Sequence, residues 1–130
     1  MDAPAADVLQ RYAAAFAEDH QRAAADFYTD DVVLRVPGRH PFAGEFRGRD
    51  AVREALDAVG RATDGTFGAR EVKGAAFTPM AALVHVIMSA VRRGRTAEWE
   101  RVILYRLAGR RIEEITFFDF DVRALEDLFD

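Results

Sequence analysis

The spacing of apolar residues predicts three helices in the first half of the chain. Apolar positions recur every three to four residues over residues 5–18 and again over residues 49–60, which is the period of an amphipathic helix. A short second helix is expected over residues 20–28. β-Branched residues at 32–36 predict the first strand, and the glycines and prolines of residues 37–48 predict a loop after it.

The second half of the chain alternates in the way that strands do. Four segments, 66–73, 81–93, 96–107 and 111–123, have the residue types and turn boundaries of strands, and residues 124–130 are expected to form a terminal helical turn or a tail. Helices followed by an antiparallel meander are typical of an α+β domain with its helices on one side of a sheet. The segment 81–93 is apolar on both faces, so we expect a homodimer that covers the outer face of the sheet.

Composition and charge narrow the classes of function. A chain of 130 residues, half of them hydrophobic, is expected to form one domain, and a net charge of −4 argues against nucleic acid or an anionic membrane as partner. The absence of cysteine excludes thiolate chemistry and fits the cytoplasm. No apolar run approaches the roughly 20 residues that span a bilayer, and no signal peptide opens the chain. Three scattered histidines and no phosphate or dinucleotide motif predict neither a metal nor a cofactor.

The most unusual residue of the last predicted strand is an acid on an apolar face. Asp119 shares its face with Ile115 and Phe117, and a buried carboxylate is costly unless it is paired or neutral. With a three-residue turn at 108–110, Trp99 would lie across from Asp119 and Arg101 diagonally. Desolvation by the tryptophan would make Asp119 a general acid or base, whereas a dominant arginine would make it a structural ion pair.

Four short segments carry a resemblance to a known family. QRYAAAF at 10–16, FYTDDVVLRVPG at 27–38, FRGRDAV at 46–52 and GRRIEEITFFD at 109–119 resemble the nuclear transport factor 2-like superfamily, in particular its SnoaL-like polyketide cyclases and ketosteroid isomerases. The resemblance implies a cone-shaped α+β barrel, in which a curved antiparallel sheet is wrapped by about three helices around an apolar pocket. It also implies a small apolar molecule as the partner and chemistry without a cofactor.

The resemblance also places the functional residues of these enzymes on positions of this sequence. The oxyanion-hole tyrosine of ketosteroid isomerases falls on Tyr12 and its supporting tyrosine on Tyr28, but their two catalytic aspartates fall on Val36 and Ile103. Steroid double-bond isomerisation by that mechanism is therefore not expected. The acid/base aspartate of SnoaL-like cyclases falls on Asp119.

These observations predict a cofactor-independent cyclase, isomerase or dehydratase acting on a polyketide- or terpenoid-like substrate. Asp119, Tyr12 and His40 are the predicted catalytic residues. The predicted substrate-binding residues are Tyr28, Val36, Phe42, Met88, Trp99, Arg101, Ile103 and Phe117. Two alternatives stay open: a non-catalytic protein that binds a hydrophobic ligand in the same pocket, and a structural dimer with a filled core.

Overall fold

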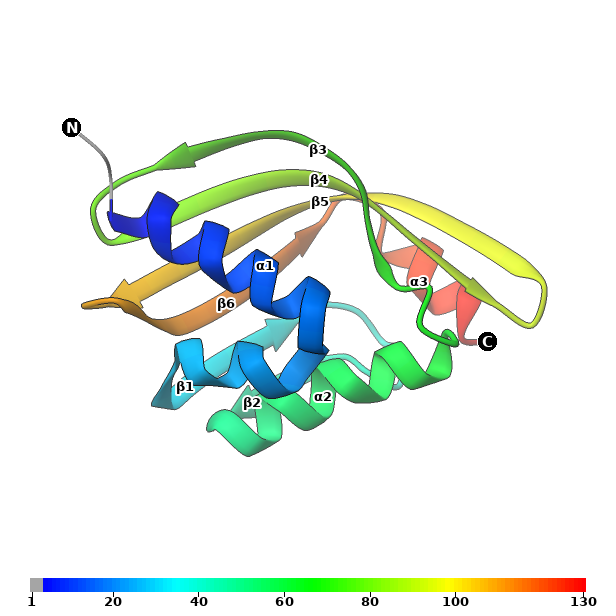
Figure 1. The fold of residues 1–130 in the computed structure, drawn as a ribbon. Coiled ribbons are helices and arrows are strands. Elements are labelled where there is room, and N and C mark those ends of the chain that lie inside the picture. Colours follow the sequence, from blue (N-terminus) through cyan, green and yellow to red (C-terminus); the bar gives the residue numbers. More distant parts are fainter. Residues whose placement is uncertain (1–3) are drawn as a thin grey trace.

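The computed structural model describes residues 4–130 and, except at residues 4 and 15–23, their side chains. The described residues form three α-helices, one 3₁₀ turn and six strands (Figure 1). In chain order these are α1 (Pro4–Ala24), η1 (Ala25–Phe27), β1 (Tyr28–Val36), β2 (Gly44–Arg47), α2 (Arg49–Ala62), β3 (Gly68–Phe77), β4 (Ala81–Arg92), β5 (Arg95–Ala108), β6 (Arg111–Asp119) and α3 (Val122–Leu128).

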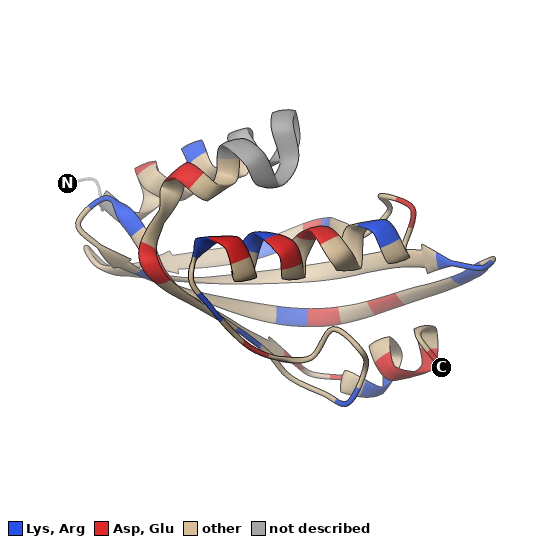
Figure 2. Cartoon of the chain, turned by 90° about the horizontal axis from the view of Figure 1, so that it is seen from below, with Lys and Arg blue, Asp and Glu red and all other residues tan. Residues whose placement is uncertain are grey.

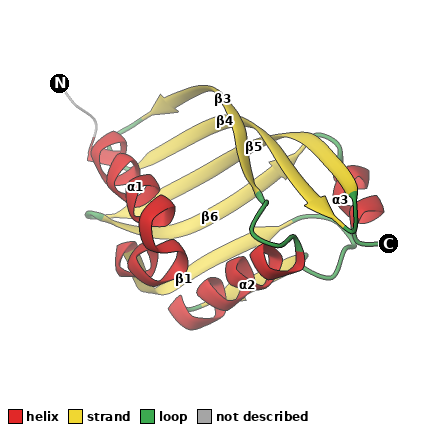
Figure 3. Ribbon diagram, turned by 45° about the vertical axis from the view of Figure 1, so that its right-hand side comes forward, coloured by secondary structure: helices red, strands yellow, loops and turns green. Residues whose placement is uncertain are grey.

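The six strands form one strongly curved sheet that does not close, in the order β2-β1-β6-β5-β4-β3. Neighbouring strands are antiparallel except β1 and β6, which pair in parallel. Helices α1 and α2 cover the concave face, and α3 lies at one end beside the β4–β5 hairpin (Figure 3). The predicted α+β class and its curved sheet wrapped by helices are confirmed, with one parallel pair that the predicted meander did not include.

The core lies between the concave face of the sheet and the two long helices. Alternate residues of β4 and β5 point into it, as the period of a strand requires, and Val52 of α2 belongs to the same buried cluster. The other side of α2 is charged (Figure 2), and Arg61 there contacts both Glu54 and Asp57. One apolar face and one charged face are what place α2 on the sheet.

Three predicted elements differ from the structure. The separate helix over residues 20–28 is wrong, because α1 runs without a break to Ala24 and Tyr28 already begins β1. No glycine or proline occurs between residues 5 and 24 to end the helix earlier. The predicted loop contains the short strand β2, which pairs with the end of β1. The terminal turn is the helix α3, whose Leu125 and Leu128 are buried.

The turn between β5 and β6 sets the position of Asp119. The turn has two residues, Gly109 and Arg110, so the predicted three-residue turn is wrong. Glu113 is then bulged out, and beyond it Arg101 lies directly across from Asp119. Trp99, which the three-residue turn would have placed there, pairs with Met88 of β4 instead. The bulge leaves both charged side chains on the concave face.

The outer, convex face of the sheet is partly apolar and uncovered. Its exposed residues include Leu83 on β4, Phe118 on β6 and Phe120 just after it. His85 stands on the same face, half-buried, where its ring contacts the Glu100 carboxylate and lies near Phe120. None of the helices in the described part of the chain combines the length and the apolar content that a bilayer crossing requires.

Candidate functional site

A small cavity opens between the sheet, α2 and α3. Five of the predicted site residues line it: Val36, His40, Phe42, Arg101 and Phe117. Its other walls come from residues that the sequence did not single out, namely Leu34, Ala55, Leu56, Val59, Phe67 and Leu125. The cavity volume is about 20 Å³, which is room for about one water molecule. Apart from His40 and Arg101, the residues that line the cavity are apolar.

Arg101 reaches the cavity from the middle of β5 and is held by a buried ion pair. Its Nε lies 2.6 Å from Oδ1 of Asp119 and its Nη2 lies 3.2 Å from Oδ2. The two side chains are only 1% and 0% exposed. Such a two-pronged contact between buried side chains is among the strongest that charged side chains make. The contact leaves each carboxylate oxygen of Asp119 with one further lone pair.

Aromatic rings surround the guanidinium of Arg101. Its central carbon lies 3.9 Å from the ring centroid of Phe117, 5.5 Å from that of Trp99 and 5.7 Å from that of Phe67. Cation–π attraction adds to the ion pair and fixes the plane of the guanidinium. Arg101 is thus locked in place from three sides, with the cavity beside it.

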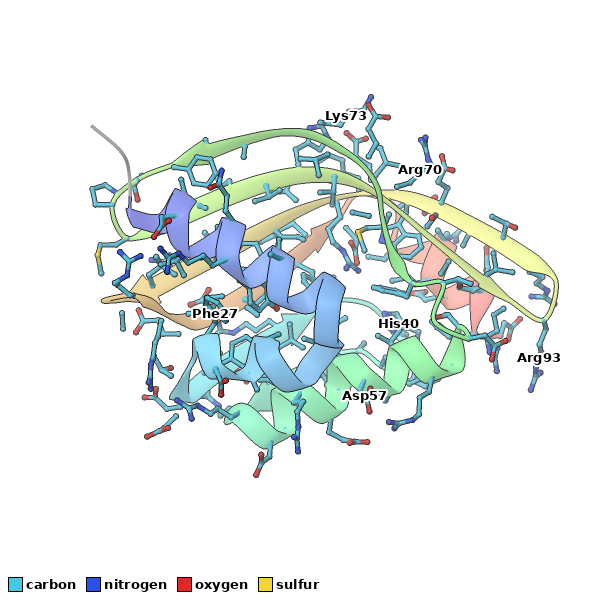
Figure 4. All side chains as sticks on the ribbon, viewed as in Figure 1. Phe27, His40, Asp57, Arg70, Lys73 and Arg93 are labelled. Carbon is cyan, nitrogen blue, oxygen red and sulfur yellow. The ribbon has the colours of Figure 1, made fainter. Side chains whose placement is uncertain are left out.

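His40 enters the cavity from the loop between β1 and β2, at the end of the molecule where α2 and α3 lie (Figure 4). It is 7% exposed, and its Nδ1 accepts a hydrogen bond of 3.2 Å from the backbone N–H of Phe42. Burial lowers the pKa of His40, although the nearby Pro37 carbonyl and the Asp119 charge act in the opposite direction. The ring is therefore neutral at neutral pH, and its proton sits on Nε2.

The Nε2 atom of His40 has no hydrogen-bond partner among the described residues. The Pro37 carbonyl is close enough to raise the pKa of His40 but does not meet hydrogen-bond geometry. A buried N–H donor without an acceptor costs free energy and is rare in folded proteins. An acceptor atom in the cavity would remove that cost.

Helix α3 closes one side of the cavity. The ring of Phe129, at the end of α3, packs edge to face on Phe42 with centroids 4.8 Å apart and lies 6.0 Å from His40. Two arginines of the β4–β5 hairpin hold the end of the helix: Arg92 donates to the carbonyl of Leu128 at 3.2 Å, and Arg95 donates to that of Asp127 at 2.9 Å. Cations at a helix C-terminus are favourable, so the hairpin pins α3 in place.

The two predicted tyrosines lie apart from the cavity lining. The hydroxyls of Tyr12 and Tyr28 are 2.8 Å apart, and Tyr105, which the sequence did not single out, packs on Tyr12 with centroids at 6.0 Å. Burial raises the pKa of Tyr28 to about 12 and that of Tyr12 well above its usual value. All three therefore remain protonated hydrogen-bonding groups.

The remaining predicted residues also face the core without lining the cavity. Met88, Trp99 and Ile103 are buried on the concave face. Trp99 packs on Phe67 and on Arg101, and its Nε1 has no partner among the described residues. Asp119 touches the cavity only through Arg101. The structure thus separates the predicted site into a tyrosine cluster near α1 and a charged cavity near α3.

Comparison with known proteins identifies relatives along nearly the whole chain. A model of the SnoaL-like domain matches residues 9–115. The uncharacterized protein Rv0034 of Mycobacterium tuberculosis is 31% identical over 123 residues, which are 95% of this chain and 94% of that protein. Among solved structures, Bal32a from a soil-derived mobile gene cassette has a TM-score of 0.89 at 20% identity and covers 98% of this chain and 97% of its own. TerC, co-crystallized with polyporic acid, has a TM-score of 0.79 at 19% identity, with 97% and 98% covered. The chain belongs to the SnoaL-like family.

Proposed function

We propose that the protein is a cofactor-independent enzyme of the cyclase, isomerase or dehydratase type, which acts by acid–base catalysis on a small apolar, oxygenated molecule. The observation that carries the proposal is the buried Arg101–Asp119 pair beside an apolar cavity, with a neutral histidine that lacks an acceptor. Membership of the SnoaL-like family supports a cyclase, isomerase or ligand-binding role. TerC, which shares the fold, was crystallized with polyporic acid.

The chemistry would pass through an enol or enolate. Asp119 does not itself line the cavity, so for it to accept a proton from a carbon next to a carbonyl group its contact with Arg101 would have to open toward the substrate. The negative charge that develops on the carbonyl oxygen would be stabilised by donors that are fixed in advance, Arg101 and His40. Protonated Asp119 would then return the proton to another carbon or to a leaving oxygen. In this arrangement Tyr12 supports the fold of the pocket and does not contact the substrate.

Hydrogen–deuterium exchange tests the proposal without a known substrate. The protein is incubated in D₂O with enolisable ketones of increasing size, such as acetone, cyclohexanone and 2-tetralone, and the loss of C–H signals is followed by NMR. We expect exchange above the buffer rate for at least one ketone, and loss of that acceleration in Asp119→Asn. Asp121→Asn is the matched control, since Asp121 is an exposed acid two residues away. Circular dichroism at the assay temperature confirms that each variant is folded.

The second candidate is a protein that binds a ligand without converting it. It is favoured by the fact that both oxygens of Asp119 already accept hydrogen bonds and that Asp119 does not itself line the cavity. In that case none of the ketones exchanges, and Asp119→Asn changes ligand affinity alone. Acceleration that persists in Asp119→Asn would reject Asp119 as the base under either reading.

A homodimer in the cytoplasm is part of the same proposal. The convex face of the sheet offers exposed rings at Phe118 and Phe120 and the side chain of Leu83, which are 49%, 63% and 47% exposed. A second copy of the chain would bury them, because aromatic and aliphatic residues on one face of a sheet favour removal from water. Light scattering at micromolar concentration tests this directly, and a monomer would contradict it.

A further inference from the structure

We propose that helix α3 is a lid over the cavity, which rotates outward about the Phe120–Asp121 link and is held closed by Arg92 and Arg95 of the β4–β5 hairpin. The inference rests on the ligand-binding role proposed for the cavity and adds how a ligand enters it. The closed cavity, with a volume of about 20 Å³, is far smaller than the roughly 300 Å³ of a small-molecule pocket. One of its walls therefore has to move before a molecule larger than water can enter.

The walls on the sheet and on α2 are the least able to move. Leu34 and Phe117 stand on β1 and β6, which pair with another strand on both sides, so moving either strand would break backbone hydrogen bonds. Helix α2 has 14 residues, and its Val52 is completely buried in the core. Helix α3 has seven residues and supplies Leu125 to the cavity wall. It is therefore the wall that can leave without disturbing the sheet.

Few contacts attach α3 to the rest of the molecule. Within the described part of the chain, its hydrogen bonds to other elements are the two that Arg92 and Arg95 donate to the carbonyls of Leu128 and Asp127. The bond from Arg95 is exposed to solvent. Arg92 also lies over the ring of Phe129, with 5.2 Å between its Cζ and the ring centroid. Both arginines thus act at the C-terminal end of the helix.

The other end of α3 is suited to be a hinge. The backbone N–H of Phe120 donates to the carbonyl of Glu100 at 3.0 Å, which is the last contact with the sheet before the helix. Asp121 follows it, is exposed, and does not cap α3 through its side chain. Loss of the two arginine contacts would therefore free the part of α3 that covers the cavity, namely Leu125 and the ring of Phe129.

An open lid should be visible in the backbone of α3. A helix of seven residues is not stable by itself in water, so α3 loses its internal hydrogen bonds when it leaves the core. The amide protons that these bonds protect then exchange with solvent, whereas the amides of the sheet stay protected until the whole domain unfolds. Exchange of the α3 amides therefore reports how often the cavity is open.

Native-state hydrogen exchange, followed by NMR at pH 7 without a ligand, measures this opening. After correction for intrinsic rates, we expect the amides of residues 125–129 to exchange at least about 100-fold faster than those of residues 100–105 in β5. In Arg92→Gln/Arg95→Gln, the α3 amides should exchange at least about tenfold faster again, while those of β5 keep their rate. Arg93→Gln is the matched control, since Arg93 stands at the tip of the same hairpin and donates no hydrogen bond to α3 (Figure 4).

Thiol labelling shows whether the opening admits a molecule to the cavity. The chain has no cysteine, so Val59→Cys places a single thiol in the cavity wall, and Val52→Cys places one in the core on the same helix. With methyl methanethiosulfonate, replacement of Arg92 and Arg95 should speed the reaction at position 59 by the same factor as the α3 amides and leave position 52 unchanged. Ala55→Cys, on the same wall, replaces Val59→Cys if that variant does not fold.

Two results would overturn the inference. In the first, the α3 amides exchange only as fast as those of β5, which would mean that α3 opens only when the domain unfolds. In the second, the double variant leaves the α3 amides or the thiol at position 59 at their former rates. Neither measurement involves turnover, so the lid and the proposed enzymatic activity succeed or fail independently.

Discussion

The sharpest prediction concerns the cost of breaking the Arg101–Asp119 pair. In Asp119→Asn, the guanidinium of Arg101 stays buried without a counter-charge, and its remaining hydrogen bond is to a neutral amide. Removal of one partner from a buried ion pair typically costs about 3–5 kcal/mol. Both side chains are buried here, 1% and 0% exposed, so the upper half of that range applies. For a domain of this size the loss corresponds to a fall in melting temperature of roughly 10–20 °C.

A double-mutant cycle separates the free energy of the interaction between Arg101 and Asp119 from the effect of replacing each side chain alone. Arg101→Met and Asp119→Val are each expected to destabilise the protein by about 3–5 kcal/mol, while the two together should be nearly neutral, because apolar residues of similar volume can replace a buried pair at little cost. The exposed pair Arg35–Glu45 is the matched control. Its side chains are 43% and 45% exposed, and the same cycle there should give less than about 1 kcal/mol.

The assay is urea unfolding at pH 7.5, followed by circular dichroism and tryptophan fluorescence. Trp99, the single tryptophan, packs on Arg101 and reports on the site directly. The reasoning would be refuted by single variants that cost less than about 1 kcal/mol, or by a double variant as unstable as the sum of the two. Either result would mean that the side chains are hydrated in solution and that no charge is buried at the cavity.

Three further predictions follow from other parts of the structure. Burial lowers the pKa of His40, so on acidification the unfolded chain takes up a proton at a higher pH than the folded chain. Below pH 6.5 the free energy of unfolding of the wild type should therefore fall by up to about 1.4 kcal/mol per pH unit more than that of His40→Gln. Urea unfolding across pH 5–8 measures the difference. Phe129→Ala removes an aromatic contact worth about 0.5–1.5 kcal/mol and should speed the association of 2-tetralone in stopped-flow fluorescence, whereas an unchanged rate would show that α3 does not limit entry. Phe118→Asp, on the convex face, should convert a dimer into a folded monomer in sedimentation equilibrium, and Arg70→Asp on the edge strand β3 should not.

Local patterns predicted the strands well, because a strand shows its period along its own sequence. The alternation over residues 81–93 and 96–107 corresponds to β4 and β5 within two residues. The pairing of two strands that are far apart in the chain leaves no pattern within either strand, so the parallel pairing of β1 with β6 was not predicted. The same limit applied at α1, where polar residues near its end looked like the start of a new helix although nothing in the sequence ends the first one.

The sequence could predict which face of a strand each site residue occupies, but not which residues lie in contact. The shared face of Arg101 and Asp119 follows from the alternation of β5 and β6, and so does their burial. Their direct contact depends on a two-residue turn and on the bulge at Glu113, whose effects on the register cancel in part. The lining by Leu125 depends on where α3 docks, which is a tertiary contact that no local pattern encodes.

A stability argument alone does not account for the ion pair. Apolar residues can replace such a pair without loss of stability, and often with a gain. In this chain the pair sits beside a cavity, ringed by Phe67, Trp99 and Phe117, where larger apolar side chains would fill the space and pack the core more fully. What a filled core would lose is a fixed guanidinium next to an apolar space. The proposed ligand-binding role gives the buried charges a use besides folding, and a double variant that is stable but no longer binds a ligand would separate that role from folding.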